Sequence, residues 1–175
     1  NPFDERRDEM HFLRARAFLE MGEVGRAVEI FEGIRKNNPF SKYNTESNYY
    51  LALISYKKGE PGKAEEAYLK AIALDPASGV PYIELSRIYA GKGELDKAEA
   101  ELKRMIQSAG SSYETLHVLA LFYESTKKFE QAEKTYLQAV TLAPQGDVTP
   151  LMNLAGFYAR TKSYDRALEA MQKAA

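Results

Sequence analysis

The feature that most constrains the fold is a spacing of about 34 residues at which the same residue types recur. Ala64, Ala98 and Ala132 are each followed four positions later by a large residue, and 34 residues separate each alanine from the next. Further copies begin at Ala27 and Ala167, which lie 37 and 35 residues from their neighbours. A fixed period of this length is typical of stacked repeats that bury their apolar faces against one another. The period predicts about five repeats and argues against a globular domain with one enclosed core.

Within each period, apolar residues at helical spacing predict two helices joined by a tight turn. In the second repeat the first helix ends before Gly59, and Pro61 opens the next helix, where its missing N–H costs little. Asp75-Pro76 ends that helix, because the residue before a proline resists the helical region. We expect helices over residues 5–21, 24–37, 45–58, 61–74, 80–91, 94–108, 112–126, 129–142, 148–161 and 164–175.

The turn between the two helices changes its residue type along the chain. Gly22, Gly59 and Gly93 occupy it in the first three repeats, as suits a left-handed residue that stops a helix. Lys127 and Lys162 stand at the same position in the last two repeats. If these lysines adopt a positive φ, each turn is strained by about 1 kcal/mol.

Small residues recur at two positions of the repeat. Only small side chains let two helix backbones approach closely, so both positions predict close helix crossings. The two sets are Ala52, Ser86, Ala120 and Ala155, and Ala64, Ala98, Ala132 and Ala167.

Composition argues against several functional classes. The chain is 45% hydrophobic and 28% charged, which favours a folded protein, and its net charge of −1 offers no field for nucleic acid. No apolar run approaches the roughly 20 residues needed to cross a bilayer, so we expect no membrane insertion by this segment. The chain starts at Asn1 and stops at Ala175 inside a helical pattern, which indicates a piece of a longer protein.

The residues that catalysis or metal binding would need are scarce. There is no cysteine, and the two histidines, His11 and His117, are far apart in the repeat pattern. No serine or carboxylate converges with a histidine by local spacing, so we expect no enzyme, metal or cofactor. His11 falls in a packing position, and we interpret Glu65-Glu66 and Lys127-Lys128 as solvated helix-face charges.

These patterns are similar to the tetratricopeptide repeat. In the second and fourth repeats the matching residues are Leu51, Ala52, Gly59, Ala64, Tyr68, Ala71 and Pro76, and Leu119, Ala120, Tyr123, Ala132, Tyr136, Ala139 and Pro144. The resemblance implies an all-α, right-handed superhelical array of antiparallel helix pairs. It would be one array over residues 1–175, with repeats at about 8–41, 45–78, 79–112, 113–146 and a truncated 148–175.

The resemblance further implies that the first helices line a concave groove that binds a peptide or protein partner. The candidate groove residues are Phe12, Arg16, Tyr49, Leu53, Tyr56, Ile83, Arg87, His117, Leu121 and Met152. Aromatic groups with a few charges are typical of interaction surfaces. The alternative for the tyrosines is contact with neighbouring repeats, and Arg87 could pair with Glu84 rather than with a partner. The basic and amide residues by which chaperone-binding members grip a carboxylate are not at their positions here.

A second function stays open, in which the array is a structural self-association module within a larger protein. Exposed apolar residues on the final helix, Leu168 and Met171, favour self-association or a continuing chain. The residues from Asn38 to Tyr43, and the sequence around Tyr123 and Tyr158, resemble bacterial envelope-assembly and exopolysaccharide-export repeat proteins. The resemblance favours a bacterial periplasm or cell envelope, with the cytoplasm as the alternative.

Overall fold

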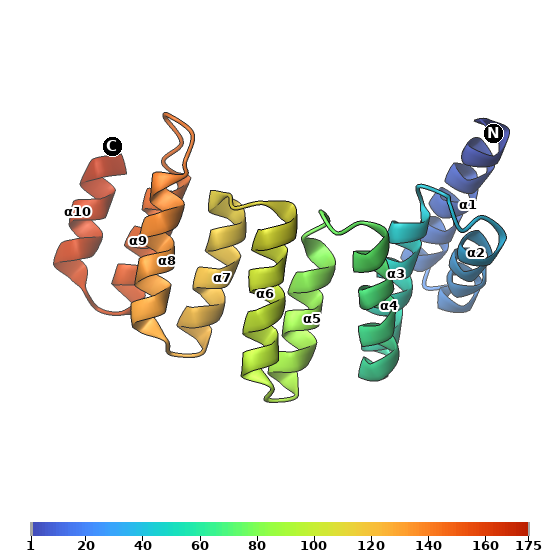
Figure 1. Cartoon of the computed structure of the whole chain (residues 1–175), viewed down its shortest axis with the longest axis horizontal. Helices are drawn as coiled ribbons and strands as arrows, with labels where there is room; N and C mark the ends of the chain where they lie inside the picture. The colour runs from blue at the N-terminus through green and yellow to red at the C-terminus, as the bar shows by residue number, and fades with distance from the viewer. Residues whose placement is uncertain (1, 175) are drawn as a thin grey trace. The chain divides into compact units, whose positions relative to one another are not determined.

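The computed structural model describes residues 2–174, with side chains from residue 5 onward, and this part of the chain is entirely helical apart from turns (Figure 1). The ten helices of the described residues are α1 (Pro2–Glu20), α2 (Val24–Asn37), α3 (Asn44–Lys57), α4 (Pro61–Leu74), α5 (Val80–Gly91), α6 (Leu95–Ala109), α7 (Tyr113–Ser125), α8 (Phe129–Thr141), α9 (Thr149–Arg160) and α10 (Tyr164–Ala174). The all-α prediction is confirmed. The helix ends lie within one residue of the predicted ones, except that α1 begins earlier, at Pro2.

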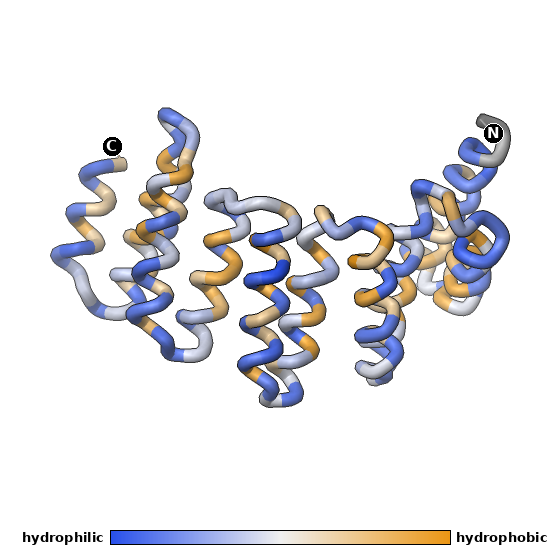
Figure 2. The backbone as a smooth tube through the Cα atoms, in the orientation of Figure 1, coloured by the Kyte–Doolittle hydropathy of each residue, from blue (hydrophilic) through white to orange (hydrophobic). Residues whose placement is uncertain are grey.

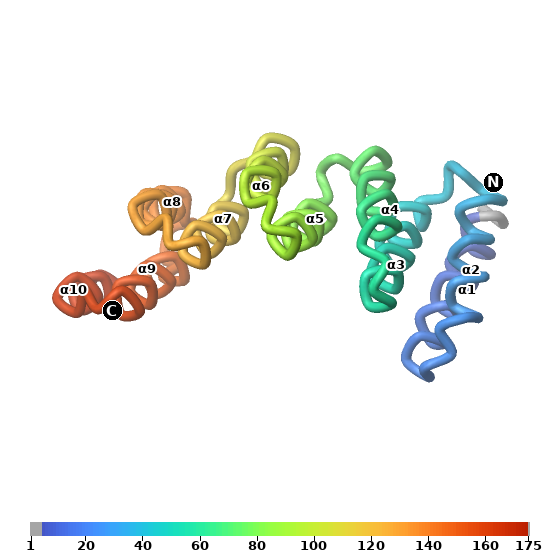
Figure 3. Tube along the Cα trace, turned by 90° about the horizontal axis from the view of Figure 1, so that it is seen from below, coloured from blue at the N-terminus to red at the C-terminus, as the bar shows by residue number. Residues whose placement is uncertain are grey.

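The chain forms two compact units, Asn1–Lys92 with α1 to α5 and Gly93–Ala175 with α6 to α10. In the N-terminal unit α1 pairs with α2 and α3 with α4, while α2 packs on α3 and α4 on α5. In the C-terminal unit α7 pairs with α8 and α9 with α10, and α7 also contacts α9 (Figure 3). The paired helices are antiparallel. That all five repeats form one continuous array stays a prediction.

Small residues lie where the helices cross. All eight members of the two sets defined from the sequence are buried, and large side chains beside them, such as Tyr68, Leu85 and Tyr136, fill the space around them. Apolar and polar residues alternate along each helix, as expected for helices that bury one face (Figure 2). In the pairs α3–α4, α7–α8 and α9–α10, which pack together within their units, the small residues are thus at the predicted close crossings.

The long connector between α2 and α3 is held by buried amides. The Asn44 Nδ2 donates to the carbonyl of Pro39 at 2.8 Å, and the Asn48 Nδ2 donates to the carbonyl of Asn44 at 2.8 Å. The Asn38 Nδ2 donates to the Asp8 Oδ2 at 2.7 Å, which ties the connector to α1. The extra residues of this connector are thus packed against the first two repeats.

The positive φ on which the predicted strain depends is present in the last two turns. Lys127 and Lys162 have φ of 60° and 61°, and the equivalent Gly22, Gly59 and Gly93 have φ between 76° and 78°. All five turns therefore have the same left-handed residue. Glycine adopts this conformation freely, whereas a lysine brings its Cβ close to the following carbonyl.

Replacing Lys127 by glycine is expected to raise the free energy of unfolding by about 1 kcal/mol, because it removes the left-handed strain. Gly59→Ala should lower it by about the same amount, although no atom lies within 4 Å of the added Cβ. Chemical denaturation of each variant measures both changes.

Gly62→Ala is the matched control, because Gly62 lies in α4 with ordinary helical φ and open space around its Cα. It should raise the free energy of unfolding by about 0.5–1 kcal/mol. If Gly59→Ala and Gly62→Ala changed the free energy of unfolding by the same amount and in the same direction, left-handed strain would not determine which residue the turn prefers.

Candidate functional site

The ten candidate residues all lie on odd-numbered helices. The N-terminal unit holds those of α1, α3 and α5, and the C-terminal unit holds those of α7 and α9. We call the residues of α3 and α5 the N-terminal face and those of α7 and α9 the C-terminal face. The N-terminal face is Tyr49, Leu53, Tyr56, Ile83 and Arg87, and the C-terminal face is His117, Leu121 and Met152.

On α1, two sequence predictions are wrong. Phe12 is only 7% exposed and its ring packs at 5.2–5.8 Å from the rings of Phe31, Tyr43 and Tyr50. Phe12 therefore fills the core between α1, α2 and α3 and presents no surface to a partner. His11 is exposed, so it is not the packing residue that the sequence predicted. Arg16, the other candidate on α1, is exposed as predicted.

The N-terminal face combines aromatic, aliphatic and charged groups. Tyr56, on α3, is 45% exposed. Leu53, also on α3, and Ile83, on α5, are half-buried. The exposed Arg87 donates from Nη1 to the Glu84 Oε1 at 2.8 Å. Arg87 therefore pairs with Glu84 in its own helix, as the one interpretation expected, and it still reaches solvent, where the other interpretation places a partner.

Tyr49 is partly a packing residue. Its ring lies 5.4 Å from the ring of Tyr50 and 6.0 Å from that of Tyr68. Burial and the nearby Glu84 carboxylate raise the pKa of the Tyr49 hydroxyl, so the phenol stays neutral. Tyr49 is therefore half-buried, with part of its ring at the N-terminal face and part packed against the ring of Tyr68.

The C-terminal face is more apolar. Leu121 and Met152 are 43% and 47% exposed, while His117 is half-buried with its ring 5.8 Å from that of Tyr136. Burial and the nearby Arg160 lower the pKa of the His117 imidazole, which favours the neutral ring at pH 7. The three side chains offer apolar contact with little charge.

An ion pair joins α7 to α9 beside this face. The Arg160 Nε and Nη2 donate to the two carboxylate oxygens of Glu124 at 2.5 and 3.0 Å, and the Tyr136 hydroxyl donates to the same carboxylate at 3.1 Å. The hydrogen bond from Arg160 lowers the pKa of Glu124 despite burial. A Cβ added at Gly156 would lie 3.1 Å from the Arg160 Nη1, so the guanidinium lies back over this glycine.

Three groups of polar contacts between repeats were not predicted from the sequence. In each one, which we call a clasp, a glutamate accepts from a tyrosine hydroxyl and pairs with a lysine or arginine of the next repeat. In the N-terminal unit, Glu65 accepts from the Tyr89 hydroxyl at 2.9 Å and from the Lys92 Nζ at 2.7 Å. In the C-terminal unit, Glu99 accepts in the same way from Tyr123 and Lys128, at 2.9 and 2.7 Å. Each clasp ties a carboxylate on a second helix to the first helix of the next repeat.

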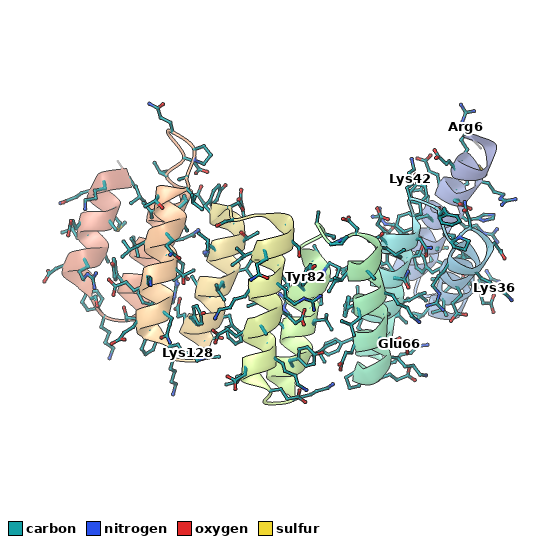
Figure 4. The ribbon with its side chains drawn as sticks, in the orientation of Figure 1. Arg6, Lys36, Lys42, Glu66, Tyr82 and Lys128 are labelled. Atoms are coloured by element: carbon teal, nitrogen blue, oxygen red, sulfur yellow. The ribbon has the colours of Figure 1, made fainter. Side chains whose placement is uncertain are left out.

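The third clasp joins Glu133 to the Tyr158 hydroxyl at 3.1 Å and to Arg166. The prediction that Glu65 and Lys128 are merely solvated charges is therefore wrong; Figure 4 shows Lys128 at the turn after α7. A usable signal was present, because in every clasp a glutamate directly after a small alanine precedes the tyrosine by 24 or 25 residues.

A hollow of the N-terminal unit is lined by none of the residues of the N-terminal face. An open pocket of about 330 Å³ lies between α2, α3 and α4, over Val28, Leu51 and Ile54. Ion pairs of Lys63 with Glu60 and of Lys70 with Glu66 form part of its rim. Its walls mix both signs of charge, so it does not favour one ligand chemistry.

Among the described residues, no three His, Cys, Asp or Glu side chains gather as metal ligands would. Across the same residues, every helix is too short or too polar to span a bilayer. What both faces can do chemically is bury apolar side chains and exchange hydrogen bonds with another molecule.

Models of the tetratricopeptide repeat match residues 9–79, 55–121 and 113–145. Anaphase-promoting complex subunit 3 of Schizosaccharomyces pombe (strain 972) is 26% identical over 133 residues, which are 75% of this chain and 20% of that protein. Cellulose synthase operon protein C of Pseudomonas fluorescens (strain SBW25) is 21% identical over 159 residues, 88% of this chain and 12% of that protein. The chain thus spans a small fraction of these relatives.

A solved tetratricopeptide repeat protein from Parabacteroides merdae has the same fold. It superposes with a TM-score of 0.68 over 95% of this chain and 65% of that one, at 17% identity. Two of these three similar proteins are bacterial, in line with the expectation from the sequence.

The Glu99 clasp makes a prediction about acid stability. Burial would raise the pKa of the Glu99 carboxyl, but hydrogen bonds from Lys103, Lys128 and Tyr123 outweigh it and lower the pKa from 4.5 to about 2. Because the pKa is depressed on folding, the stabilisation is complete above pH 4.5 and is lost as the pH falls to about 2.

The free energy of unfolding of Glu99→Gln should therefore lie below that of the wild type at pH 7, and the gap should shrink steadily between pH 5 and pH 2. Urea titrations across this range measure the gap. Glu130→Gln, at an exposed position of α8, is the control and should change little at any pH. A gap for Glu99→Gln that stays constant over this range would contradict the assigned clasp.

Proposed function

Because this chain belongs to the tetratricopeptide repeat family, we propose that it is a protein-interaction scaffold that holds a peptide or protein partner against its odd-numbered helices. The family fold is typical of protein–protein interaction scaffolds and is generally non-catalytic. The partner would contact the N-terminal and C-terminal faces. The larger proteins that share the repeat are relatives by sequence, and their partners are not carried over to this chain.

The observation that supports this proposal is the exposure of large apolar side chains on first helices. Tyr56, Leu121 and Met152 are each nearly half exposed, with exposed or half-buried polar groups beside them. Exposed apolar patches rimmed by polar residues mark interaction sites, since they otherwise favour aggregation. Aromatic and arginine side chains such as Tyr56 and Arg87 are enriched among the residues that dominate binding energy.

The test compares two triple variants of matched exposure. Peptides selected from a random display library on the wild type should bind Tyr56→Ala/Leu121→Ala/Met152→Ala at least about tenfold more weakly, because each truncation of a buried contact costs about 1–2 kcal/mol. Fluorescence anisotropy measures the affinity, and circular dichroism checks that the variant is folded.

The control is Leu69→Ala/Leu74→Ala/Leu137→Ala, which removes similarly exposed leucines from the even-numbered helices α4 and α8. Its affinity should match the wild type. If only this control variant loses binding, the partner lies on the even-numbered helices and the assignment of the two faces is wrong.

Self-association is the second candidate function, and α10 is the observation that favours it. Leu168 and Met171 are exposed there. A pocket of about 260 Å³ between α8, α9 and α10 has an apolar floor that includes Leu137, Val140 and Leu151, with Arg166, Glu169 and Lys173 on its α10 wall. An apolar helix face next to a pocket with an apolar floor is suited to packing against a second copy of the chain.

Sedimentation velocity over a range of concentrations tests this candidate. If α10 mediates self-association, the wild type forms a dimer at high concentration and Leu168→Glu stays monomeric, because the buried carboxylate would lose its water. A wild type that stays monomeric throughout would eliminate this candidate and leave the scaffold proposal untouched.

A further inference from the structure

A buried hydroxyl in the N-terminal unit lacks a hydrogen-bond partner. Tyr68, on α4, is 1% exposed, and its hydroxyl oxygen is buried without any donor or acceptor within reach. Leaving such a group unpaired destabilises the folded state relative to an apolar residue of the same shape. Burial and the charge of Glu84 raise the pKa of Tyr68, so the phenol keeps its proton and can donate it. The hydroxyl is therefore an unused donor.

The other repeats avoid this cost at the equivalent position. Phe31, Leu102 and Met171 carry no hydroxyl there, and all three are at the position four residues after the small alanine. Tyr136 does carry one, but it donates to Glu124. Among the five repeats, only Tyr68 places a hydroxyl at this position without a partner of its own.

The pair α7–α9 shows what would satisfy Tyr68. There, one carboxylate accepts both from the tyrosine hydroxyl and from the guanidinium of Arg160. The position of Glu124 in its repeat is occupied by Tyr56 in the second repeat. The hydroxyl of Tyr68 thus lacks the carboxylate that its counterpart has.

The arginine has changed place by one helical turn. On α9 the order is Gly156 and Arg160, and on α5 the equivalent residues are Arg87 and Gly91. The guanidinium of Arg160 lies back over Gly156, and that of Arg87 lies back toward Glu84, to which it donates a hydrogen bond. Burial raises the pKa of the Tyr68 hydroxyl, but the charge of Arg87 acts to lower it, so the guanidinium lies near that group. Both helix pairs therefore combine a buried tyrosine with an arginine, and only the carboxylate is missing in one.

The missing group cannot come from the nearby Glu84. Its carboxylate accepts from the Arg87 Nη1 at 2.8 Å, yet it lies outside hydrogen-bond distance of the Tyr68 hydroxyl, which has no partner. The guanidinium of Arg87 keeps further N–H donors for a second carboxylate, and its side chain is largely exposed. Glu84 also balances the charge of Arg87, so this ion pair has no net charge when no partner is bound.

We infer that Tyr68 and Arg87 form a receptor for one acidic side chain of a partner segment, whose carboxylate takes the place that Glu124 has between α7 and α9. This inference rests on the proposed function and specifies the chemistry of the partner. The carboxylate accepts from the Tyr68 hydroxyl and from the Arg87 guanidinium. The exposed ring of Tyr56 and the edge of the Tyr49 ring contact the apolar residues that flank the acidic residue of the partner.

Access requires that side chains around the Tyr68 hydroxyl move. The hydroxyl is covered in the partner-free chain, and the proposal requires the side chains of Tyr56 and Arg87, which reach solvent, to turn aside when the partner binds. The partner segment is thus an acidic residue next to an apolar or aromatic one, lying across α3 and α5.

Tyr68→Phe tests the receptor, because it removes only the hydroxyl. Peptides selected on the wild type should carry an aspartate or glutamate, and their affinity for Tyr68→Phe should fall about tenfold, the loss expected for a hydrogen bond to a charged group. The thermal midpoint of Tyr68→Phe should equal or exceed that of the wild type, because an unpaired buried hydroxyl is removed. Weaker binding with undiminished stability separates this role from a structural one.

Tyr136→Phe is the matched control. It removes the hydroxyl that Glu124 already binds, so its thermal midpoint should fall and its peptide affinity should not change. Changing the peptide acid to its amide should weaken binding to the wild type by more than it weakens binding to Tyr68→Phe, because in that variant only the pairing with Arg87 is left to lose.

The outcomes separate the two proposals. Selected peptides that bind through the N-terminal and C-terminal faces but need no acidic residue, or that bind Tyr68→Phe as tightly as the wild type, overturn the receptor and leave the scaffold proposal standing. A lower thermal midpoint for Tyr68→Phe also overturns it, because the hydroxyl then has a structural partner. A library that yields no peptide sensitive to either face overturns both.

Discussion

Both units depend on small side chains at the points where helices cross. Ala52 and Ala64 in the N-terminal unit, and Ala120 and Ala132 in the C-terminal unit, are fully buried and let the paired helices approach closely. Large residues then fill the space beside them, as Tyr68 and Tyr136 do. Because a pair of short helices cannot enclose its own apolar face, each pair must pack on its neighbours. The spacing of small residues therefore determines which helix faces are buried and which are left exposed.

Electrostatic contacts between repeats add to this packing in a regular way. The glutamates of the three clasps accept from a tyrosine and from a lysine or arginine of the next repeat. The glutamates are on the second helices, and each takes up one tyrosine of the following first helix, so the other positions of the odd-numbered helices can differ from repeat to repeat. On those helices, Glu124 and Arg160 form an internal pair in the C-terminal unit, whereas Tyr56 and Arg87 remain accessible in the N-terminal unit.

The candidate surface was only partly predictable. Tyr56, Leu121 and Met152 are exposed, in keeping with their positions in the repeat, but Phe12 is buried because α1 packs on α2 and α3 along an aromatic cluster. A repeat position is an average over the family, and a terminal repeat departs from it where its neighbours differ. His11 was misplaced for the same reason, since its position is a packing one in other repeats but is exposed on α1.

The sequence by itself determined the local structure of the described residues: the ten helices, the five turns and the position in each turn at which a left-handed residue is expected. These features depend on residues close together in the chain, whose spacing and backbone preferences are readable directly. Only the tertiary structure decided which polar groups are paired. Glu65 accepts a hydrogen bond from Tyr89, 24 residues away in the chain, and Glu124 accepts from Arg160, 36 residues away. The hydroxyl of Tyr68 has no hydrogen-bond partner. Hydrogen bonding requires atoms within about 3 Å, and side chains so distant in sequence reach that range only when packed helices bring them together.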